Sequence, residues 1–488
     1  MFSALSAYGI TCLLLAQTSA PAATGEPTGR AAPNANAAWR ELFAQDPPRD
    51  ADRDPKPEAN RDANRPGNRD ANRRIDAVLA ACGGSAQRVK ALIASDDAYE
   101  ELKPSVRKER TRVADGNKPY DVEFLVYVPR GYDPKKPWPL VLSCHGQGGS
   151  GSHAAAMAQQ LLGPDRDKYV VVAPTMPGPE VYSGKPYQEQ AYLQPLEWAR
   201  RRLHIDGGRV YVTGYSLGGH NTWHLATMYG RLFAAAVPMA GSPVFEGAPY
   251  TCNSYMENLG NLPLWAIWGE EDTAPPPATQ GNVDVCRLAA ARLKELGNAE
   301  FKGTELPGAG HGECFPPPSE FRKFLEAGKR EPVPQNFTHT FHLWHHRRGY
   351  YLEAVALTRP PLNLEHGIRV ELPASLGHKP TTKEVLDAGE KILTKSLFRF
   401  SAELDRPHNA LTVKADGVRV LRLYVMEGMF DLSQPVTIRF GEKAWQGKIV
   451  PSARAMLQHY SAERDAAAIV LNELDLDAGG RVAVRFKD

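Results

Sequence analysis

The serine at position 216 lies in a glycine-framed motif that constrains the fold more than any other feature of the sequence. The motif Gly-Tyr-Ser-Leu-Gly at 214–218 follows the apolar run 210–213 and precedes a helix-compatible stretch at 221–229. A serine hydroxyl is a useful nucleophile only where it is exposed and a base can reach it. Glycines two positions before and after the serine permit the sharp strand-to-helix turn that achieves this. The motif therefore predicts a strand, a tight turn and a helix, with Ser216 as the nucleophile.

Short apolar runs alternate with helix-compatible segments from Ile75 to about Glu331. The expected strands are 121–128, 138–143, 169–173, 210–213, 234–239, 264–268 and 300–305, and the expected helices are 188–203, 221–229 and 283–296. Short, continuously apolar strands that alternate with helices are typical of a mostly parallel sheet covered on both faces. We therefore predict a doubly wound α/β catalytic domain over residues 75–331.

After the proline-rich segment 330–334, the alternation of strand-like and helix-like segments gives way to mostly strand-like segments. The expected strands are 337–343, 350–357, 368–372, 397–401, 410–413, 418–425, 436–440, 444–449 and 481–486, and the expected helices are 382–394 and 453–463. Many short strands separated by turn signals favour a sandwich-like β-rich module. We expect this second domain to occupy residues 336–488.

The N-terminal part of the chain is predicted to contain an export signal followed by a linker. An apolar run at 10–16 precedes small residues at 18–23, which predicts a signal peptide over 1–22. The alternative, an uncleaved membrane anchor, is disfavoured because the run is shorter than the about 20 residues that a spanning helix needs. Residues 23–74 are rich in Arg, Asp, Asn and Pro, so we expect a disordered linker there. The mature protein is then secreted or periplasmic.

The partners of the nucleophile should follow later strands. Asp272 comes directly after the apolar run 264–268, where a carboxylate can orient a histidine and stabilise its charged form; Glu270 and Glu271 are rivals in the same turn. His311 follows the last expected strand in a glycine-rich loop, and an imidazole there can take the serine proton. The order of serine, acid and histidine along the chain predicts the catalytic set Ser216, Asp272 and His311.

The glycine-rich segment 143–151, after an earlier expected strand, predicts an oxyanion hole. Stabilising the negative oxygen of a tetrahedral intermediate requires fixed backbone N–H donors. We assign the first donor to Gln147, with Gly148 as the next candidate, and the second to Leu217, which follows the nucleophile. A phosphate-binding loop is the alternative, but the segment lacks the required lysine and the glycine spacing. His145 is interpreted as loop scaffolding because it precedes the serine.

Four histidines, His339, His342, His345 and His346, raise the question of a metal site. Their spacing fits neither helical ligation nor a Cys/His finger, and the sequence has no C-x-x-C pair, so we expect histidines on strand surfaces and no metal. The neighbouring aromatic residues are interpreted as core, with a sugar-stacking face as the alternative. His220 and His224 are expected to be helix residues near the pocket. A formal net charge of +2 argues against a nucleic-acid partner.

Four stretches, 209–223, 233–241, 264–273 and 306–311, resemble the α/β-hydrolase superfamily. Within it they are similar to the secreted esterase and predicted-peptidase branch, near feruloyl esterases, polyhydroxybutyrate depolymerases and prolyl-oligopeptidase-like domains. The resemblance implies ester hydrolysis through an acyl-enzyme without a cofactor. No long insertion resembles a lid, so an open pocket would suit a small-molecule ester or an acylated polysaccharide. A serine peptidase and an inactive binding protein on a hydrolase scaffold are the alternatives.

Overall fold

The computed structural model describes residues 34–44, 66–116, 118–177, 186–243, 252–273, 281–361 and 378–487. The expected signal peptide, the middle of the expected linker at 45–65 and the expected strand 368–372 lie outside these ranges. In the described part of the chain, no helix combines the length and the apolar character that a membrane span requires.

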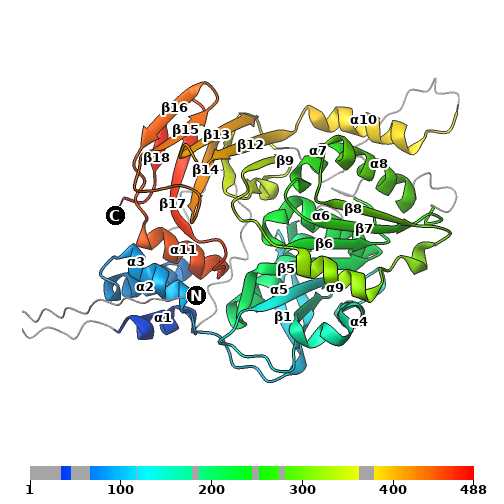
Figure 1. The fold of residues 1–488 in the computed structure, drawn as a ribbon, viewed down its shortest axis with the longest axis horizontal. Coiled ribbons are helices and arrows are strands. Elements are labelled where there is room, and N and C mark those ends of the chain that lie inside the picture. Colours follow the sequence, from blue (N-terminus) through cyan, green and yellow to red (C-terminus); the bar gives the residue numbers. More distant parts are fainter. Residues whose placement is uncertain are drawn as a thin grey trace, which may run out of the picture.

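Eight strands form one sheet, in the order β1-β2-β4-β3-β5-β6-β7-β8 (Figure 1). The strands are β1 (Ser105–Asp115), β2 (Lys118–Val128), β3 (Trp138–Cys144), β4 (Val170–Pro174), β5 (Ile205–Tyr215), β6 (Ala235–Met239), β7 (Leu264–Gly269) and β8 (Phe301–Leu306). The β1–β2 and β2–β4 pairs are antiparallel, and all pairs from β4 to β8 are parallel. The predicted mostly parallel α/β sheet is confirmed.

Helices cover both faces of this sheet. The larger ones are α4 (Gly151–Leu162), α5 (Pro186–Arg202), α6 (Leu217–Tyr229), α8 (Asn282–Glu295) and α9 (Pro318–Ala327). Strand β5 shows why its sequence is continuously apolar: Val210 and Val212 pack in the core beneath α5, α6 and α8, whereas Tyr211 packs with α4 and α9 on the opposite face. The short elements are α7 (Cys252–Tyr255), η2 (Gly163–Lys168), η3 (Gly230–Leu232), η5 (Met256–Leu259) and η6 (His311–Glu313).

The C-terminal module consists of two five-stranded sheets, as predicted for a β-rich domain. One has the order β10-β11-β14-β17-β18 and the other β16-β15-β13-β12-β9. Their strands are β9 (Asn336–Phe341), β10 (Arg348–Gly349), β11 (Leu352–Leu357), β12 (Phe398–Asp405), β13 (Ala410–Asp416), β14 (Val418–Met426), β15 (Val436–Phe440), β16 (Lys443–Gly447), β17 (Val470–Asp477) and β18 (Val482–Val484). Apolar residues from both sheets share one core. Helices α10 (Thr382–Thr394) and α11 (Ala453–Glu463) have the predicted bounds, and η7 (Trp344–His346) follows β9.

Three helices lie in the N-terminal part of the chain, where a linker and the start of the catalytic domain were expected. Helices α1 (Ala35–Phe43) and α2 (Pro66–Ala81) lie partly or wholly within the linker expected to be disordered, and α3 (Ala86–Ala94) lies within the expected catalytic domain. All three pack instead against α11 of the C-terminal module. Each of the first two helices buries a pair of apolar residues at helical spacing in this contact: Trp39 and Leu42 on α1, and Ile75 and Val78 on α2. These pairs provide apolar burial that the charged sequence around them does not.

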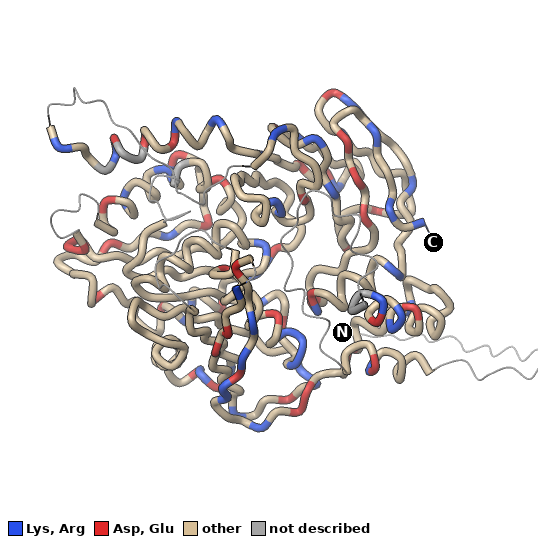
Figure 2. Tube along the Cα trace, turned by 180° about the vertical axis from the view of Figure 1, so that it is seen from behind, with Lys and Arg blue, Asp and Glu red and all other residues tan. Residues whose placement is uncertain are grey.

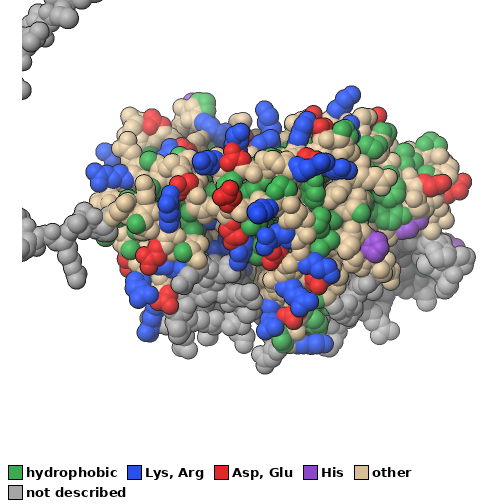
Figure 3. All heavy atoms as spheres, turned by 90° about the horizontal axis from the view of Figure 1, so that it is seen from below, with side chains coloured by type: hydrophobic (Ala, Val, Ile, Leu, Met, Phe, Trp, Pro, Cys, Tyr) green, Lys and Arg blue, Asp and Glu red, His purple; other side chains and the backbone are tan. Residues whose placement is uncertain are grey.

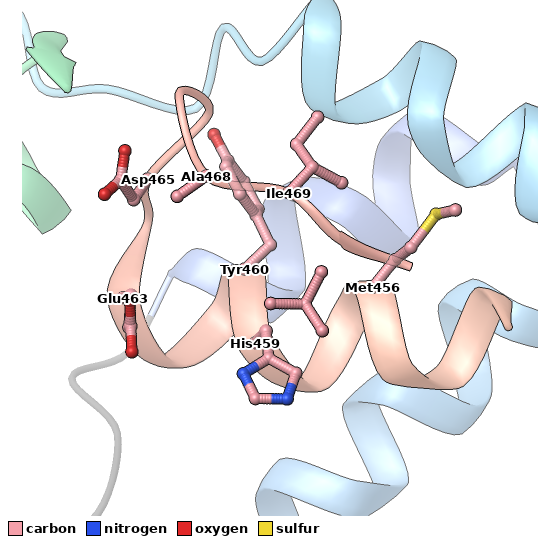
Figure 4. A pocket seen from close by; sticks show the side chains of 8 residues that line it. Met456, His459, Tyr460, Glu463, Asp465, Ala468 and Ile469 are labelled. Carbon is pink, nitrogen blue, oxygen red and sulfur yellow. The ribbon is translucent and has the colours of Figure 1, made fainter. Parts of the chain in front are cut away.

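Helix α11 is the centre of this N-terminal contact. Figure 4 shows Met456, Tyr460 and Ile469 around a small cavity beside α11 and the segment that follows it. The Tyr460 hydroxyl donates to Asp96, which follows α3, at 2.7 Å. Asp96 also pairs with Arg464 at the C-terminal end of α11, and both side chains are almost fully buried.

Charged residues of both signs are distributed together over the surface. Figure 2 shows basic and acidic residues interspersed along the trace, including the β1–β2 hairpin, where Arg112 and Asp121 pair at 2.8 Å. On the face drawn in Figure 3, basic and acidic side chains are also mixed, with hydrophobic side chains between them. The absence of a nucleic-acid partner stays a prediction from the overall charge.

Candidate active site

Ser216 occupies a strained turn between β5 and α6. Its φ of 59° and ψ of −120° lie in a region that residues other than glycine rarely adopt. The Ser216 N–H donates to the carbonyl of Met239 on β6 at 2.9 Å. The turn requires close backbone packing: a Cβ on Gly214 would lie 2.3 Å from the Gly218 carbonyl oxygen, and one on Gly218 would lie 2.2 Å from that of Cys144. The glycines of the motif are therefore required by space.

The structure brings His311 and Asp272 into line with this serine. His311 Nε2 lies 2.8 Å from Ser216 Oγ, and His311 Nδ1 lies 2.9 Å from Asp272 Oδ2. His311 begins η6 after β8, and Asp272 lies in the turn after β7. The Asp272 side chain is 8% exposed and that of His311 is 43% exposed, so the carboxylate is shielded while the imidazole remains accessible. This is the hydrogen-bonded order that a serine, a base and an orienting acid require.

The two rival carboxylates lie elsewhere in the same turn. Both Glu270 and Glu271 are exposed. The Glu270 carboxylate accepts from the N–H of Gly308 at 2.9 Å, in the loop that leads to His311. Asp272 is the residue of the three whose carboxylate is bonded to the His311 ring.

A hydrogen-bond network behind Asp272 contains residues that the sequence analysis did not identify. Asn282 Nδ2 donates to Asp272 Oδ2 at 3.0 Å and to the Ala240 carbonyl at 3.2 Å. The Ser242 hydroxyl donates to Asn282 Oδ1 at 3.1 Å, and the Ser242 carbonyl accepts from His220 Nδ1 at 2.7 Å. Asn282 lies at the start of α8, and its position next to the end of β7 is a property of the fold that residue spacing does not reveal.

The two histidines of this region have different electrostatic surroundings. The hydrogen bond to Asp272 raises the pKa of His311 above the ordinary 6.5, although partial burial opposes the shift. Burial lowers the pKa of His220, with the positive charge of a protonated His311 as a further contribution. His220 is therefore the neutral member of the pair near pH 7, and His311 is the more basic one.

The segment 143–151 lies beside the nucleophile. An ideal Cβ on Gly146 would lie 3.5 Å from Ser216 Cβ, which places this loop against the elbow. The Gly149 N–H bonds to the Gly146 carbonyl at 3.0 Å, so Gln147 and Gly148 occupy the centre of a tight turn. The His145 ring fixes the loop, because its Nδ1 lies 2.8 Å from the Gly146 carbonyl and its Nε2 accepts from the Met176 N–H at 2.9 Å. This arrangement matches the interpretation of His145 as scaffolding.

Leu217 is the first residue of α6. The N–H groups in the first turn of a helix have no intrahelical acceptor, so they are available to a ligand. The positions of Gln147 and Leu217 beside Ser216 are compatible with their expected role as oxyanion donors.

An aromatic pair flanks the same site. The Tyr215 ring stacks on the exposed Phe315 ring with centroids 4.8 Å apart. The Tyr215 hydroxyl donates to the backbone carbonyl of His311 at 2.6 Å. Tyr215 thus holds the histidine loop, a contact that was not anticipated from the sequence.

The histidines near β9 are buried, which corrects the expectation that they lie on strand surfaces. His339, His342 and His346 are each at most 4% exposed. Burial lowers the pKa of His339 and of His342 to about 4. The neighbouring Phe341, Tyr350 and Tyr351 belong to the core of the C-terminal module, so the core interpretation is confirmed for these three. Trp344, the fourth aromatic residue of the set, is half-buried. His345 and His346 instead meet Glu189 of α5, and these three could hold a metal ion.

Parts of the chain are similar in sequence to an esterase and to a depolymerase. A scan against models of known protein families finds no match. Over 198 residues the chain is 28% identical to poly(3-hydroxyalkanoate) depolymerase C of Paucimonas lemoignei. The matched stretch covers 34% of this chain and 47% of that protein. Over 127 residues it is 29% identical to the bifunctional acetylxylan esterase/xylanase XynS20E of Neocallimastix patriciarum, which covers 25% of this chain and 18% of that protein. The chain therefore spans less than half the length of these relatives.

Solved structures with related architecture include a thermostable esterase and the ferulic acid esterase AmCE1/Fae1A of Anaeromyces mucronatus. The first is 21% identical, with a TM-score of 0.36 over 46% of this chain and 63% of that one. The second is 16% identical, with a TM-score of 0.33 over 47% of this chain and 92% of that one. Because both TM-scores are below 0.5, the fold assignment depends on the strand order and connections of this chain. The two sequence relatives, an esterase and a depolymerase, support the predicted resemblance to secreted esterases of the α/β-hydrolase superfamily.

Proposed function

We propose that this protein is an exported serine hydrolase that cleaves carboxylic esters through an acyl-enzyme. The observation that carries the proposal is the line of hydrogen bonds from Ser216 Oγ through His311 to Asp272, at 2.8 Å and 2.9 Å. The esterase and depolymerase among the sequence relatives support the same reaction class. The apolar run at 10–16 supports export through a signal peptide over 1–22.

In the proposed mechanism, His311 Nε2 takes the proton of Ser216 as its Oγ attacks the ester carbonyl carbon. Asp272 holds the ring with Nδ1 protonated and stabilises the imidazolium that forms. The N–H groups of Gln147 and Leu217 donate to the negative oxygen of the tetrahedral intermediate, and each such donor contributes about 3 kcal/mol in comparable enzymes. His311 then returns the proton to the leaving alcohol, and an acyl-Ser216 ester remains. Water, activated by His311, hydrolyses this ester and restores the free hydroxyl.

For the substrate we propose a small-molecule ester or an acylated polysaccharide. The names of the two relatives give acetylated xylan and poly(3-hydroxyalkanoate) as the materials on which those proteins act. The exposed Phe315, stacked on Tyr215 beside the nucleophile, offers a flat apolar surface for an acyl chain or a sugar ring.

A substrate panel tests the proposal. The purified chain and its Ser216→Ala variant are assayed with p-nitrophenyl acyl esters, acetylated and feruloylated sugars, and aminoacyl anilides. We expect turnover of at least one ester class by the wild type and none above background by the variant. Faster turnover of the anilides than of every ester would replace the esterase with a peptidase. Turnover of none of the substrates would favour a binding protein on a hydrolase scaffold.

A further inference from the structure

A buried cluster of one carboxylate and three imidazoles lies away from the proposed catalytic residues. Glu189 comes from α5, His224 from α6, and His345 and His346 from η7 in the C-terminal module. Glu189 Oε1 lies 2.7 Å from Nε2 of His224 and 2.7 Å from Nε2 of His346, and Glu189 Oε2 lies 3.4 Å from Nε2 of His345. His224 is two helical turns beyond Ser216, roughly 12 Å along α6 at 1.5 Å per residue, so this is a separate site.

The donor atoms are of the kind and spacing that a zinc ion uses. One ligand atom each from Glu189, His345 and His346 lies within 4.8 Å of the others. Zn²⁺ binds imidazole nitrogen and carboxylate oxygen at about 2.0–2.2 Å, so tetrahedral ligand atoms are separated by roughly 3.4 Å. The Glu189–His345 separation already has this value. The two 2.7 Å separations would open by about 0.7 Å when an ion replaces the hydrogen bonds.

A second observation points to a missing ligand. The buried nitrogen His345 Nε2 has no hydrogen-bond partner among the residues that the structure describes. Buried polar atoms in native proteins are nearly always bonded, so an exception requires an explanation, such as a bound ion or water. This nitrogen lies 3.4 Å from Glu189 Oε2. A cation between them would satisfy it.

The charges around the cluster favour a cation as the occupant. The Glu189 side chain is 1% exposed, and a buried carboxylate requires a compensating charge. Arg347, which follows η7, is paired with Glu353 at 2.7 Å. The Glu189 carboxylate also accepts from the Tyr229 hydroxyl, which is neutral. His345 is 19% exposed and gives the site an edge toward solvent through which an ion can arrive.

We propose that Glu189, His345 and His346, with His224 as a further ligand, bind one zinc-like divalent cation that ties the α/β domain to the C-terminal module. Binding requires an unprotonated nitrogen toward the ion, so the ring proton of each ligating histidine lies on its other nitrogen. For His346, whose Nε2 faces the Glu189 carboxylate, this is Nδ1. The cation joins helices α5 and α6 to η7 and has a structural role. This departs from the expectation of no metal, because the carboxylate that completes the set lies far away in the sequence.

Metal titration of the full chain tests this site. The protein is stripped with a chelator, dialysed and titrated with Zn²⁺ by calorimetry, and Co²⁺ absorption reports a tetrahedral nitrogen and oxygen environment. The variants are His345→Ala, at the edge of the cluster, and Glu189→Gln, which keeps the shape of the side chain. The matched control is His408→Ala, which removes an exposed histidine that also pairs with a carboxylate, that of Asp405. Circular dichroism verifies that each variant is folded.

We expect one Zn²⁺ per chain and a raised Tm for the wild type and for His408→Ala. Binding should weaken at least about ten-fold in His345→Ala and in Glu189→Gln. Two results would overturn the site: a folded wild type that takes up no Zn²⁺ or Co²⁺, or variants that bind the ion as the wild type does. The wild-type titration decides the question even if a variant fails to fold. Ester hydrolysis should be the same with and without the ion, so the outcome is independent of the proposed catalytic residues.

Discussion

At the scale of single residues, Ser216 is held in a backbone conformation that costs about 1–3 kcal/mol relative to relaxed alternatives. The bond from its N–H to Met239 and the packing around Gly214 and Gly218 maintain it there. This conformation places the hydroxyl within hydrogen-bonding distance of His311 without further movement of the backbone. Strain at this residue and the reactivity of its hydroxyl therefore have one structural cause.

The pH dependence of hydrolysis should report the raised pKa of His311. The base must be neutral to accept the serine proton, so kcat/KM should fall as pH decreases through this pKa, with a midpoint above 6.5. Asp272→Asn removes the largest cause of the shift, so the midpoint should move to lower pH while kcat drops by about 10⁴. Rate profiles between pH 4 and 9 measure both effects. An unchanged midpoint in the variant would show that Asp272 does not set the basicity of His311.

Asn282 should support catalysis through Asp272 without contacting the substrate. Asn282→Ala removes the 3.0 Å bond to the carboxylate, and a hydrogen bond to a charged group contributes about 1.5–3 kcal/mol. We expect kcat to fall by roughly ten-fold or more, with little change in KM. The matched control is Asn298→Ala. Asn298 lies beyond the C-terminal end of α8, and its side chain donates to the Leu259 carbonyl. Equal kcat values for the two variants would contradict the positioning role.

Ser216 and Asp272 could be proposed from the sequence because each follows an apolar strand in a distinctive turn. His311 could be proposed because it lies in a glycine-rich loop after the last strand, and the order of the three residues along the chain limits the choice. Asn282 carries no such signal. It lies in an ordinary helical turn, and its meeting with Asp272 depends on the three-dimensional course of the chain. The contact between Glu189 and His346 could not be predicted for the same reason. These residues are far apart in sequence and meet only when the C-terminal module packs against α5.

At the scale of secondary-structure elements, the proposed site is formed where parallel strands end. Ser216, Asp272 and His311 follow the carboxyl ends of β5, β7 and β8, and the loop with Gln147 follows β3. The carboxyl ends of parallel strands lie at one edge of the sheet, where ligands of open α/β folds bind. Parallel order is therefore what brings together side chains that are distant along the chain.

Strand β1 and helices α1 to α3 show where element prediction from sequence failed. Strand β1 carries alternating charges, and of its residues only Val113 is buried, so the sequence lacks an apolar signal. Among the strands that the structure describes, it lies at the edge of the sheet and pairs with β2. The charged N-terminal helices are stabilised by burial against α11, which lies hundreds of residues later in the chain. Local sequence could not reveal that contact.

Asp96 should anchor these N-terminal helices. It accepts from Trp39 Nε1 on α1 at 3.0 Å and from Arg464 beyond α11 at 2.9 Å. Asp96→Ala leaves the Arg464 guanidinium buried without its carboxylate, which costs about 3–5 kcal/mol for comparable pairs. We expect faster hydrogen exchange in α1 to α3, measured by mass spectrometry. The control is the neighbouring Asp97→Ala, which breaks an exposed ion pair with Arg40 and should leave the exchange rates unchanged. Similar exchange rates in the two variants would contradict the anchoring role of Asp96.

At the scale of the whole molecule, the α/β domain and the C-terminal module share buried polar contacts. Asn258 beside the α/β core exchanges two bonds with the backbone of Thr340 on β9, at 3.0 Å and 2.7 Å. Arg330 precedes β9 and donates to Asp465 after α11 at 2.5 Å. Arg200 of α5 lies 3.6 Å from the same carboxylate, and all three side chains are at most 4% exposed. The two domains should therefore unfold together.

Asp465→Ala tests this coupling. It leaves two buried guanidinium groups without their carboxylate, so we expect the free energy of unfolding to fall by about 3–5 kcal/mol. Calorimetry of the wild type should show one transition, which moves to lower temperature in the variant. Asp405→Ala, which breaks an exposed pair with His408, should change the stability by less than about 1 kcal/mol. Two separate wild-type transitions, with only one shifted, would mean that the domains are independent.

Covalent labelling with a fluorophosphonate probe, followed by peptide mass spectrometry, tests the central claim most directly. The probe reacts with a serine only where a neighbouring base and an oxyanion site activate the hydroxyl. We predict one adduct per chain, on the peptide that contains Ser216, with no adduct in Ser216→Ala and much slower labelling in His311→Ala. A wild type that stays unlabelled, or a Ser216→Ala variant that is labelled as fast as the wild type, would contradict the account.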